Sequence, residues 1–257
     1  MTTPAIEIKN LRFAYKDKPI LKGIDLSILP GQIIGYIGPN GAGKSTTVKI
    51  MLGLLSGFEG EVKIMGQDVR KDPVDVKRLV GYVPENAELY DVLTPMEFLS
   101  FVGKLHDLPE EVIEERATRM LTYFGLKDRL NERMDAYSKG MKQKVLLASG
   151  LIHNPQIIFL DEPLSGLDAN AVILVKEIIS RLAAEGKTIF YCSHMMDIVE
   201  KVSDRIIIIS EGSIIADGAF EELRQEHGGT LERIFSQLTS KDDMEDNAAG
   251  FLESFKV

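Results

Sequence analysis

The stretch QIIGYIGPNGAGKST, residues 32–46, decides the fold class of this chain. Its first half is an almost unbroken apolar run, which is typical of a strand buried on both faces of a parallel sheet. Its second half, GPNGAGKST (residues 38–46), matches the pattern G-x-x-x-x-G-K-[ST]. Apolar residues at helical spacing then predict a helix from Lys44 to about Leu55. A strand, a glycine-rich loop and a helix in this order predict a loop that binds phosphate groups.

The residue types of this loop suit the phosphates of a nucleoside triphosphate. Glycine allows the tight turns that direct backbone N–H groups inward, and the following helix adds the positive end of its dipole. Lys44 can reach the outer phosphates, and the Ser45 hydroxyl can bind Mg²⁺. A glycine-rich turn with a surface lysine is the alternative, and the position between strand and helix argues against it. The predicted nucleotide-binding residues of the loop are Gly38, Pro39, Asn40, Gly41, Ala42, Gly43, Lys44, Ser45 and Thr46.

Two acids, Asp161 and Glu162, follow a second apolar run, PQIIFL. Ligand sites in α/β proteins lie at the carboxyl ends of such strands. Because neighbouring strand residues point in opposite directions, we expect the two acids to have different roles. Asp161 suits the binding of Mg²⁺, and Glu162 suits the orientation of a water molecule and the acceptance of its proton. For an isolated pair, solvated acids at a strand end would be the simpler interpretation.

His194 follows a third apolar run, TIFYC, at residues 188–192. From the end of a third strand it could contact the γ-phosphate of the nucleotide. Without the other motifs, a polar residue at the start of a helix would be the favoured interpretation. With Glu162 and Lys44, His194 completes the predicted catalytic set.

The composition is that of a soluble globular protein, with 257 residues of which 44% are hydrophobic and 27% are charged. A net charge of −9 argues against direct binding of nucleic acid, because phosphate contacts need a basic surface. The single cysteine, Cys192, excludes a disulfide framework within the chain. The apolar runs are far shorter than the ~20 residues of a membrane-spanning helix, and the first residues lack a signal-peptide pattern. We therefore expect a protein that neither crosses a membrane nor is exported.

The pattern along the chain predicts an α/β domain with a helical insert. The region from about 86 to 154 has helical spacing, with Thr94 and Pro109 as helix starts. Strand–helix alternation then resumes, and the tail from Ala219 should form short helices, with a mobile acidic segment at 240–250. The expected strands are 6–15, 24–29, 32–38, 157–161, 188–193, 205–210 and 214–218, with a strand and turn in 60–69 and helices at 169–186 and 195–202.

Five motifs in this order resemble those of the ATP-binding subunit of ABC transporters, over about residues 5–218. GPNGAGKST is similar to the Walker A loop, and IIFLDEP is similar to Walker B, with Glu162 as the catalytic carboxylate. YSKGMKQK, residues 137–144, resembles the family's signature segment. SGLD, which ends at Asp168, resembles the D-loop, and His194 in YCSHMMD resembles the switch histidine.

The resemblance implies two such cassettes that pair head to tail with two ATP molecules between them. The signature residues of one chain, Ser138, Lys139, Gly140 and Met141, would complete the phosphate site of the other. Ser138 suits this role because it is a good N-cap residue before an apolar-faced helix, although an ordinary capped helix has the same pattern. Tyr15 stands where the family places an aromatic ring that stacks on adenine, although a strand residue at this spacing can also simply pack.

Two residues depart from the usual family pattern. Lys139 replaces the first glycine of the signature, which adds a positive charge that is compatible with ATP binding. Glu85 replaces a glutamine that touches Mg²⁺ and links the nucleotide to the membrane partner, and a carboxylate can still bind Mg²⁺ or its water shell. Lys139 and Glu85 at these two positions are similar to the residues of a branch of bacterial drug, antibiotic-peptide and ABC-2-type exporters. We therefore expect export rather than import.

The resemblance also implies the fold and the domains. The expected fold is an α/β P-loop NTPase core with a mostly parallel sheet, an N-terminal antiparallel β subdomain and an inserted α-helical subdomain. Residues 1–218 would form the ABC ATPase domain, with the helical subdomain at about 86–154, and residues 219–257 would form a helical and acidic tail.

We therefore predict an ATP-hydrolysing subunit that powers a separate transmembrane subunit for the export of a drug, peptide or lipid-like substrate. The expected cofactors are ATP and Mg²⁺, with Ser45, Asp161 and Glu85 as metal ligands. The expected partners are a transmembrane permease subunit and a second ABC cassette, either a second copy or a related chain. The expected location is cytoplasmic, peripheral on the inner face of the cell membrane.

Three other functions are compatible with parts of this pattern. A soluble ABC ATPase that remodels ribosomes or DNA would usually carry two motif sets, whereas this chain has one and is acidic. A regulatory subunit that binds ATP without hydrolysis would not need Glu162 and His194. A small-molecule kinase that shares only the phosphate loop would leave the signature and the D-loop unexplained.

Residues 86–108 contain apolar side chains that could contact the membrane partner. Leu89, Tyr90, Phe98 and Phe101 are the candidates for an exposed apolar groove. Core packing within the helical insert would explain them as well.

Overall fold

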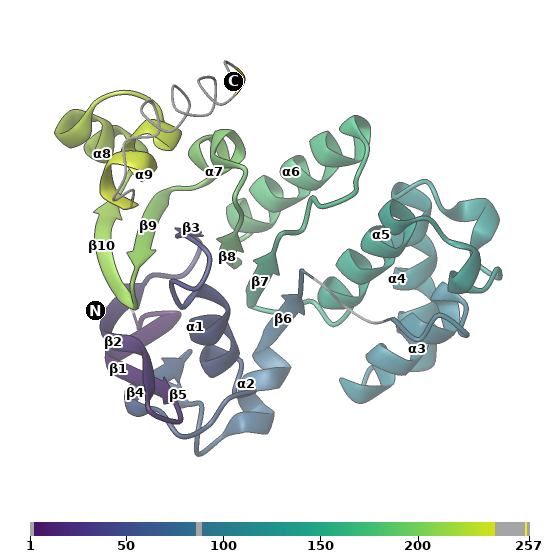
Figure 1. The fold of residues 1–257 in the computed structure, drawn as a ribbon. Coiled ribbons are helices and arrows are strands. Elements are labelled where there is room, and N and C mark those ends of the chain that lie inside the picture. The colour runs from purple at the N-terminus through teal and green to yellow at the C-terminus, as the bar shows by residue number, and fades with distance from the viewer. Residues whose placement is uncertain (1–2, 86–88, 240–254, 256–257) are drawn as a thin grey trace.

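A six-stranded sheet forms the centre of the computed structural model, which describes residues 3–85, 89–239 and 255 (Figure 1). The strand order is β10-β9-β3-β8-β7-β6; β6 to β9 run parallel to β3, and β10 runs antiparallel to β9. Every residue of β3 and β8 is buried, as expected for strands covered on both faces. The strands are β3 (Ile33–Ile37), β6 (Val80–Val83), β7 (Ile157–Asp161), β8 (Thr188–Cys192), β9 (Arg205–Ser210) and β10 (Ser213–Gly218).

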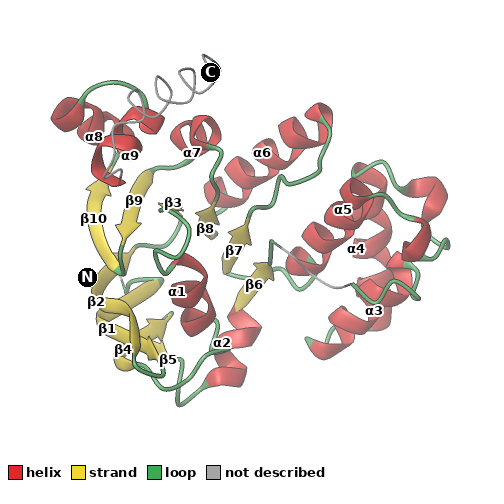
Figure 2. Cartoon of the chain, in the orientation of Figure 1, coloured by secondary structure: helices red, strands yellow, loops and turns green. Residues whose placement is uncertain are grey.

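A second sheet of four antiparallel strands, in the order β2-β1-β4-β5, confirms the expected N-terminal β layer. Helix α1 (Lys44–Met51) shares one apolar core with this sheet and with the central strands, so it lies between the two sheets (Figure 2). The strands of this sheet are β1 (Ile6–Tyr15), β2 (Lys18–Ile28), β4 (Glu59–Ile64) and β5 (Gln67–Asp68).

Helix α1 is shorter than predicted, because it ends at Met51 and not near Leu55. Gly53 has a φ of 64°, in the left-handed region, and its N–H donates to the Ile50 carbonyl at 2.9 Å. Such a glycine closes the C-terminus of a helix by satisfying its last carbonyl groups. The apolar spacing continues past the end of the helix because Leu52 is still buried in the core.

Helices α3 to α5 lie in the chain between β6 and β7, in agreement with the predicted helical region. Thr94 and Glu97 form a capping box at the start of α3, and Pro109 is the N-cap residue of α4, so both predicted helix starts are confirmed. Strand β6 and helix α2 (Pro73–Leu79) were not predicted, because both are only a few residues long. The helices are α3 (Pro95–Leu105), α4 (Glu110–Tyr123) and α5 (Lys139–Leu151), with single 3₁₀ turns at Lys127–Arg129 and Met134–Ala136.

The last part of the chain follows the predicted order of elements. Helices α6 (Ala169–Ala184) and α7 (Met196–Val202) alternate with strands, and β9 and β10 form the expected hairpin. The tail contains two short helices, α8 (Phe220–His227) and α9 (Leu231–Thr239), as predicted, and the acidic segment 240–250 lies outside the described residues. None of the described helices combines the length and the hydrophobicity that crossing a bilayer requires.

Two histidines stack where the end of α3 meets the turn before β7. The rings of His106 and His153 are 3.6 Å apart between centroids and nearly parallel, at 9°. His153 Nε2 also lies 3.0 Å from the Val80 carbonyl oxygen at the start of β6. The neighbouring Arg78 and Asp107 form an ion pair of 3.0 Å, so this contact joins α3 to the edge of the central sheet.

Burial of the ring, with the charge that His106 would add beside it, lowers the pKa of His153 to about 4. Arg116 and Lys187 lower it further, while the hydrogen bond to Val80 opposes the shift. Burial also lowers the pKa of His106. Both rings are therefore neutral at pH 7, and a proton on either one would place a positive charge against its neighbour.

We expect the stability of the protein to fall as the pH is lowered from 6.5 towards 4. Unfolded His153 takes up a proton near its ordinary pKa of 6.5, whereas the folded ring does so only near pH 4. The unfolded state therefore binds more protons in this window, and the free energy of unfolding decreases with decreasing pH. Urea denaturation at pH values from 7 to 4 should show a shallower slope for His153→Gln than for the unmodified protein. His227→Gln on α8 is the control and should keep the full slope; equal slopes for both variants would contradict the assignment to His153.

Candidate active site

Three segments meet at one edge of the central sheet because β3, β7 and β8 are parallel neighbours. They are the loop 38–43 after β3, the pair Asp161 and Glu162 at the end of β7, and the pair Ser193 and His194 after β8. All three segments line one cavity of about 770 Å³, a size that suits a small-molecule ligand. Of the residues predicted from the sequence, the cavity brings together Gly38, Pro39, Asn40, Gly41, Ala42, Gly43, Lys44, Ser45, Thr46, Glu85, Asp161, Glu162 and His194.

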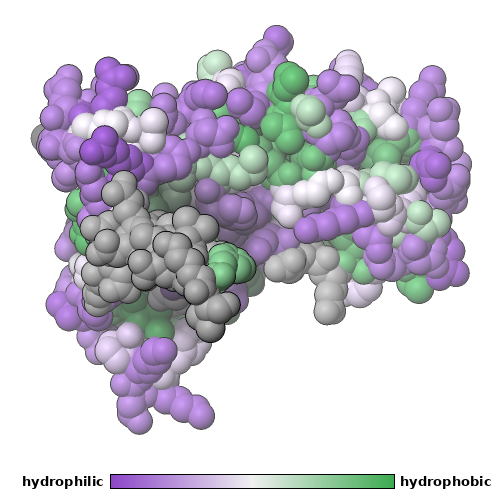
Figure 3. Space-filling view, turned by 45° about the horizontal axis from the view of Figure 1, so that its top comes forward, coloured by the Kyte–Doolittle hydropathy of each residue, from purple (hydrophilic) through white to green (hydrophobic). Residues whose placement is uncertain are grey.

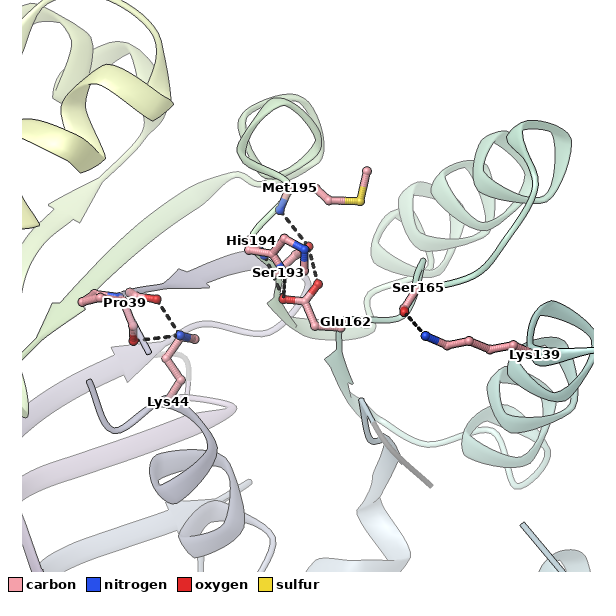
Figure 4. A network of polar contacts seen from close by, with 9 residues as sticks. Pro39, Lys44, Lys139, Glu162, Ser165, Ser193, His194 and Met195 are labelled. Atoms are coloured by element: carbon pink, nitrogen blue, oxygen red, sulfur yellow. Dashed lines mark hydrogen bonds and ion pairs between the residues drawn. The ribbon is translucent and has the colours of Figure 1, made fainter. Parts of the chain in front are cut away.

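The loop between β3 and α1 needs glycine for its shape. Gly41 and Gly43 have φ values of 79° and 111°, which residues with a side chain rarely adopt. A side chain on Gly38 would collide with the carbonyl oxygen of Ile209 on β9. The loop folds around Lys44, whose Nζ donates to the carbonyl oxygens of Gly38 at 2.5 Å and Pro39 at 3.2 Å (Figure 4). The ammonium group and the N-terminus of α1 thus face the same cavity, which makes this wall suitable for an anion.

Glu162 is held by the segment that follows β8. Its carboxylate accepts hydrogen bonds from the Ser193 hydroxyl at 3.0 Å and from the His194 backbone N–H at 2.8 Å (Figure 4). The His194 ring contributes a third contact, with Nδ1 2.8 Å from the same carboxylate. The side chain of Glu162 is 13% exposed, whereas that of His194 is 80% exposed. The carboxylate is therefore fixed in place, while the ring beside it stays open to a ligand.

The reason we gave for the different directions of Asp161 and Glu162 is wrong. Strand β7 ends at Asp161, so the two acids are not successive strand residues. Glu162 has a φ of 49°, a left-handed conformation that costs a residue with a side chain on the order of 1–3 kcal/mol. The bonds from Ser193 and His194 keep it there, and they connect the end of β7 to the end of β8. The turn of the backbone, and not strand alternation, separates the two carboxylates.

The environment of Asp161 disfavours its negative charge. Burial, together with the carboxylates of Glu85 and Glu162, raises the pKa of Asp161 to about 6, although Lys44 acts in the opposite direction. A divalent cation beside these oxygens would offset the repulsion, and the hydroxyl and carboxylate oxygens of Ser45 and Asp161 suit such an ion. Within the described residues no three His, Cys, Asp or Glu side chains form a metal site by themselves. The residues present therefore fit Mg²⁺ whose remaining ligands come from another molecule, such as the oxygens of a phosphate group.

The signature segment lies away from this cavity. Ser138 is the N-cap residue of α5 and accepts a hydrogen bond from the Met141 N–H at 3.3 Å. Lys139 donates to the Ser165 hydroxyl at 3.0 Å (Figure 4), and a side chain on Gly140 would crowd the Gly166 carbonyl oxygen. The start of α5 thus packs on the loop before α6, and residues 138–141 are not among the described residues that line the cavity. The extra charge of Lys139 is directed towards this loop within its own chain.

Two further predicted site residues also lie outside the cavity lining. Asp168 is the N-cap residue of α6 and accepts a hydrogen bond from the Ala171 N–H at 2.9 Å. That bond, from a backbone N–H, lowers the pKa of Asp168. Tyr15, on β1, is 46% exposed and meets Phe13 edge-on, with the ring centroids 4.8 Å apart.

Four residues of the cavity were not predicted from the sequence: Ile20, Ser193, Met196 and Phe235. Ser193 could have been found, because it is a hydroxyl residue directly before His194 at the end of a predicted strand. Ile20 and Phe235 lie far from the motifs along the chain, in β2 and α9, and only the fold brings them here.

A second hollow, of about 620 Å³, lies between α4, α5 and α6 and is almost entirely apolar. Its lining includes Met120, Leu174 and Ile178, and Figure 3 shows hydrophobic residues gathered over this part of the surface. No residue predicted to take part in the chemistry lines it, so it is separate from the candidate active site.

Comparison with known proteins decides the family. The sequence model described as ABC transporter matches residues 21–165, which is more than half of the chain and includes the loop, β7 and the signature segment. The chain belongs to the ABC transporter family. It is an ATP-binding subunit of this family and an ATPase, as the predicted motifs implied.

Similar proteins of the family include two from resistance systems. The chain is 36% identical over 224 residues to the linearmycin resistance ATP-binding protein LnrL of Bacillus subtilis, covering 87% of this chain and 72% of LnrL. It is 33% identical over 232 residues to the daunorubicin/doxorubicin resistance ATP-binding protein DrrA of Streptomyces peucetius, covering 90% of this chain and 70% of DrrA. A solved structure of the ATP-binding subunit of an ABC transporter is 31% identical, with a TM-score of 0.86 over 92% of this chain and 100% of that one.

We expect Lys44→Ala to weaken ATP binding by at least about tenfold, because a hydrogen bond to a charged group contributes about 1.5–3 kcal/mol. Filter binding with labelled ATP measures the effect directly. Lys49→Ala, an exposed lysine on the same helix, is the matched control and should bind ATP nearly as the unmodified protein does. Undiminished ATP binding by Lys44→Ala would contradict the role of the loop.

Proposed function

We propose that this chain hydrolyses ATP to drive a separate transmembrane subunit that exports a substrate. The observation that carries the proposal is the single cavity in which Lys44, Asp161 and Glu162 meet at neighbouring strand ends. Similarity to LnrL and DrrA, both resistance ATP-binding proteins, supports export of a drug-like, peptide or lipid-like compound. The substrate itself would be selected by the membrane subunit.

Different groups of this chain have different roles in ATP hydrolysis. Lys44 and the N–H groups of the loop bind the phosphates and stabilise the negative charge that develops during the reaction. Ser45 and Asp161, with Glu85 nearby, would hold Mg²⁺, which supplies charge neutralisation across the phosphate oxygens when bound. Glu162 orients a water molecule and accepts its proton.

His194 and Ser193 support Glu162 and complete the site. Their hydrogen bonds fix the carboxylate of Glu162, which lines the cavity. The exposed ring of His194 is then available to the γ-phosphate. A base that is held in advance needs little reorganisation when the water attacks the γ-phosphate, which is the general advantage of a preorganised site.

A second cassette would complete the site from the opposite side. Ser138 and Lys139 are exposed and lie outside the cavity of their own chain. The N-terminus of α5 is therefore free to meet the phosphates held by another cassette, as the head-to-tail arrangement requires. Asp168 and the loop before α6 would lie at the same interface, and Tyr15 would meet the adenine ring.

The helical region would form the surface for the membrane partner. Tyr90 is 60% exposed and Phe101 is 46% exposed, and their rings contact edge-on, with centroids 6.1 Å apart. Phe98, another candidate for the exposed groove, is buried in the core, so the core-packing alternative holds for this residue. Leu89 is half-buried. Leu89 and Glu85 line one small hollow. The exposed pair Tyr90 and Phe101 would be the place where coupling to a partner begins.

We propose the corresponding organisation for the whole chain. Residues 1–218 form the ATPase domain, with a helical subdomain at about 86–154, and residues 219–257 form a C-terminal tail. The protein would lie on the cytoplasmic face of the membrane, attached through its permease, without contact to nucleic acid.

We expect Glu162→Gln to reduce ATP turnover by ~10²–10⁴-fold, the usual contribution of a general base, because the amide cannot accept the proton. ATP binding should persist, since Lys44 and Asp161 are unchanged. Phosphate release and filter binding measure the two quantities separately. The exposed Glu185→Gln is the control and should keep its turnover.

The same variant tests the pairing of cassettes. Loss of one negative charge beside the triphosphate should favour the closed pair, so Glu162→Gln with Mg-ATP should sediment as a dimer. Full hydrolysis by Glu162→Gln would mean that Glu162 is not the general base.

We expect Phe101→Glu to abolish co-purification with a membrane protein from the native cells while ATP binding persists, because a charge would disrupt an apolar contact. The control is Tyr123→Glu, an aromatic residue of α4 that is 71% exposed and lies by the second hollow. Unchanged co-purification of Phe101→Glu would contradict the proposed coupling surface.

A further inference from the structure

The C-terminal helix α9 reaches the ATP cavity. Phe235, on this helix, lines the cavity together with Met196 at the start of α7. Helix α9 carries none of the family motifs described above, the last of which is at His194. The side chain is therefore an addition to the wall that the family motifs build.

Packing and one hydrogen bond fix α9 in this place. Leu231 and Ile234 are fully buried, and Phe235 and Leu238 follow on the same face at helical spacing. The Leu231 N–H donates to the Glu200 carboxylate of α7 at 3.2 Å, which anchors the start of α9. Figure 1 shows α9 below α8, on the side of the molecule where β9 and β10 lie. The helix is thus held by its apolar face, and Phe235, which is partly buried against the same core, also lines the cavity.

The anchor of α9 is also connected to the catalytic carboxylate. Helix α7 begins at Met196, two residues after His194, and it contains Glu200 near its other end. His194 in turn contacts Glu162. Phe235, Met196 and His194 all line the cavity, and α9 packs on α7, which follows His194. We therefore place Phe235 on the His194 side of the cavity, where the γ-phosphate is expected.

We propose that Phe235 is a water-excluding wall of the ATP cavity at its γ-phosphate end. The proposal rests on the proposed function, because it places the phosphates of ATP between the loop and His194. An apolar ring there excludes bulk water from the charged groups, which strengthens their electrostatic interactions with the γ-phosphate. The C-terminal tail is then part of the ATPase site.

The chain contains no tryptophan, so Phe235→Trp would give a protein with a single reporter at this position. Its fluorescence emission should change on titration with ATP in the presence of EDTA. The change should be half-maximal at an ATP concentration equal to the dissociation constant measured by filter binding. Gln237→Trp, two residues along on the exposed side of α9, is the control and should not respond. An unresponsive Phe235→Trp protein that binds ATP normally would overturn the proposal.

Removal of the Phe235 ring should weaken the binding of ATP more than the binding of ADP. Phe235→Ala should weaken ATP binding by roughly five- to tenfold and leave ADP binding within about twofold, because only ATP places a phosphate beside this wall. Phe235→Leu should retain most of the ATP affinity that Phe235→Ala loses, since leucine is also apolar. Equal losses for ATP and ADP would mean that Phe235 only supports the fold, and would overturn the proposal.

The two proposals can fail separately. If Lys44→Ala weakens ATP binding as expected and Phe235→Trp does not respond, only the role of Phe235 is wrong. If ATP binding survives Lys44→Ala unchanged, the phosphates do not lie in this cavity, and both proposals are wrong.

Discussion

The parallel pairing of β3, β8 and β7 is the constraint on which the rest of the structure depends. Pairing of Ile33 with Ile189, and of Asp161 with Cys192, sets how far each strand extends towards the common edge. The phosphate loop, the carboxylates and the histidine segment leave three strands that are hydrogen-bonded neighbours. A shift of one residue in either pairing would exchange the faces of a strand and move its terminal group away from the cavity.

The same arrangement concentrates like charges. Asp161, Glu85 and Glu162 line one cavity, and only Lys44 among the cavity's described residues opposes them as a cation. Burial, and then the neighbouring carboxylates of Glu85 and Glu162, raise the pKa of Asp161. Functional sites commonly contain such groups, because a bound ligand and its counter-ion restore the balance. The electrostatics of the cavity are thus suited to the bound state more than to the free one.

Helices α5 and α9 differ in whether they carry a motif and in whether they line the cavity. The signature helix α5 points its N-terminus elsewhere and packs closely on the loop before α6, where Gly140 meets Gly166. Helix α9, by contrast, carries no recognisable motif and yet supplies Phe235 to the cavity wall. A motif therefore identifies what a segment can bind, while the fold determines whether the segment meets the ligand of its own chain or that of another.

The sequence by itself determined the features that depend on adjacent residues. The loop of residues 38–46, the helix start at Thr94 and the N-cap at Ser138 each need only a few successive side chains, so their patterns predicted them correctly. Only the tertiary structure decided the left-handed backbone of Glu162, the burial of Phe98 beside an exposed Phe101, and the position of Phe235. The physical reason is that each of these depends on contacts between segments far apart in the chain, and local spacing carries no information about such contacts.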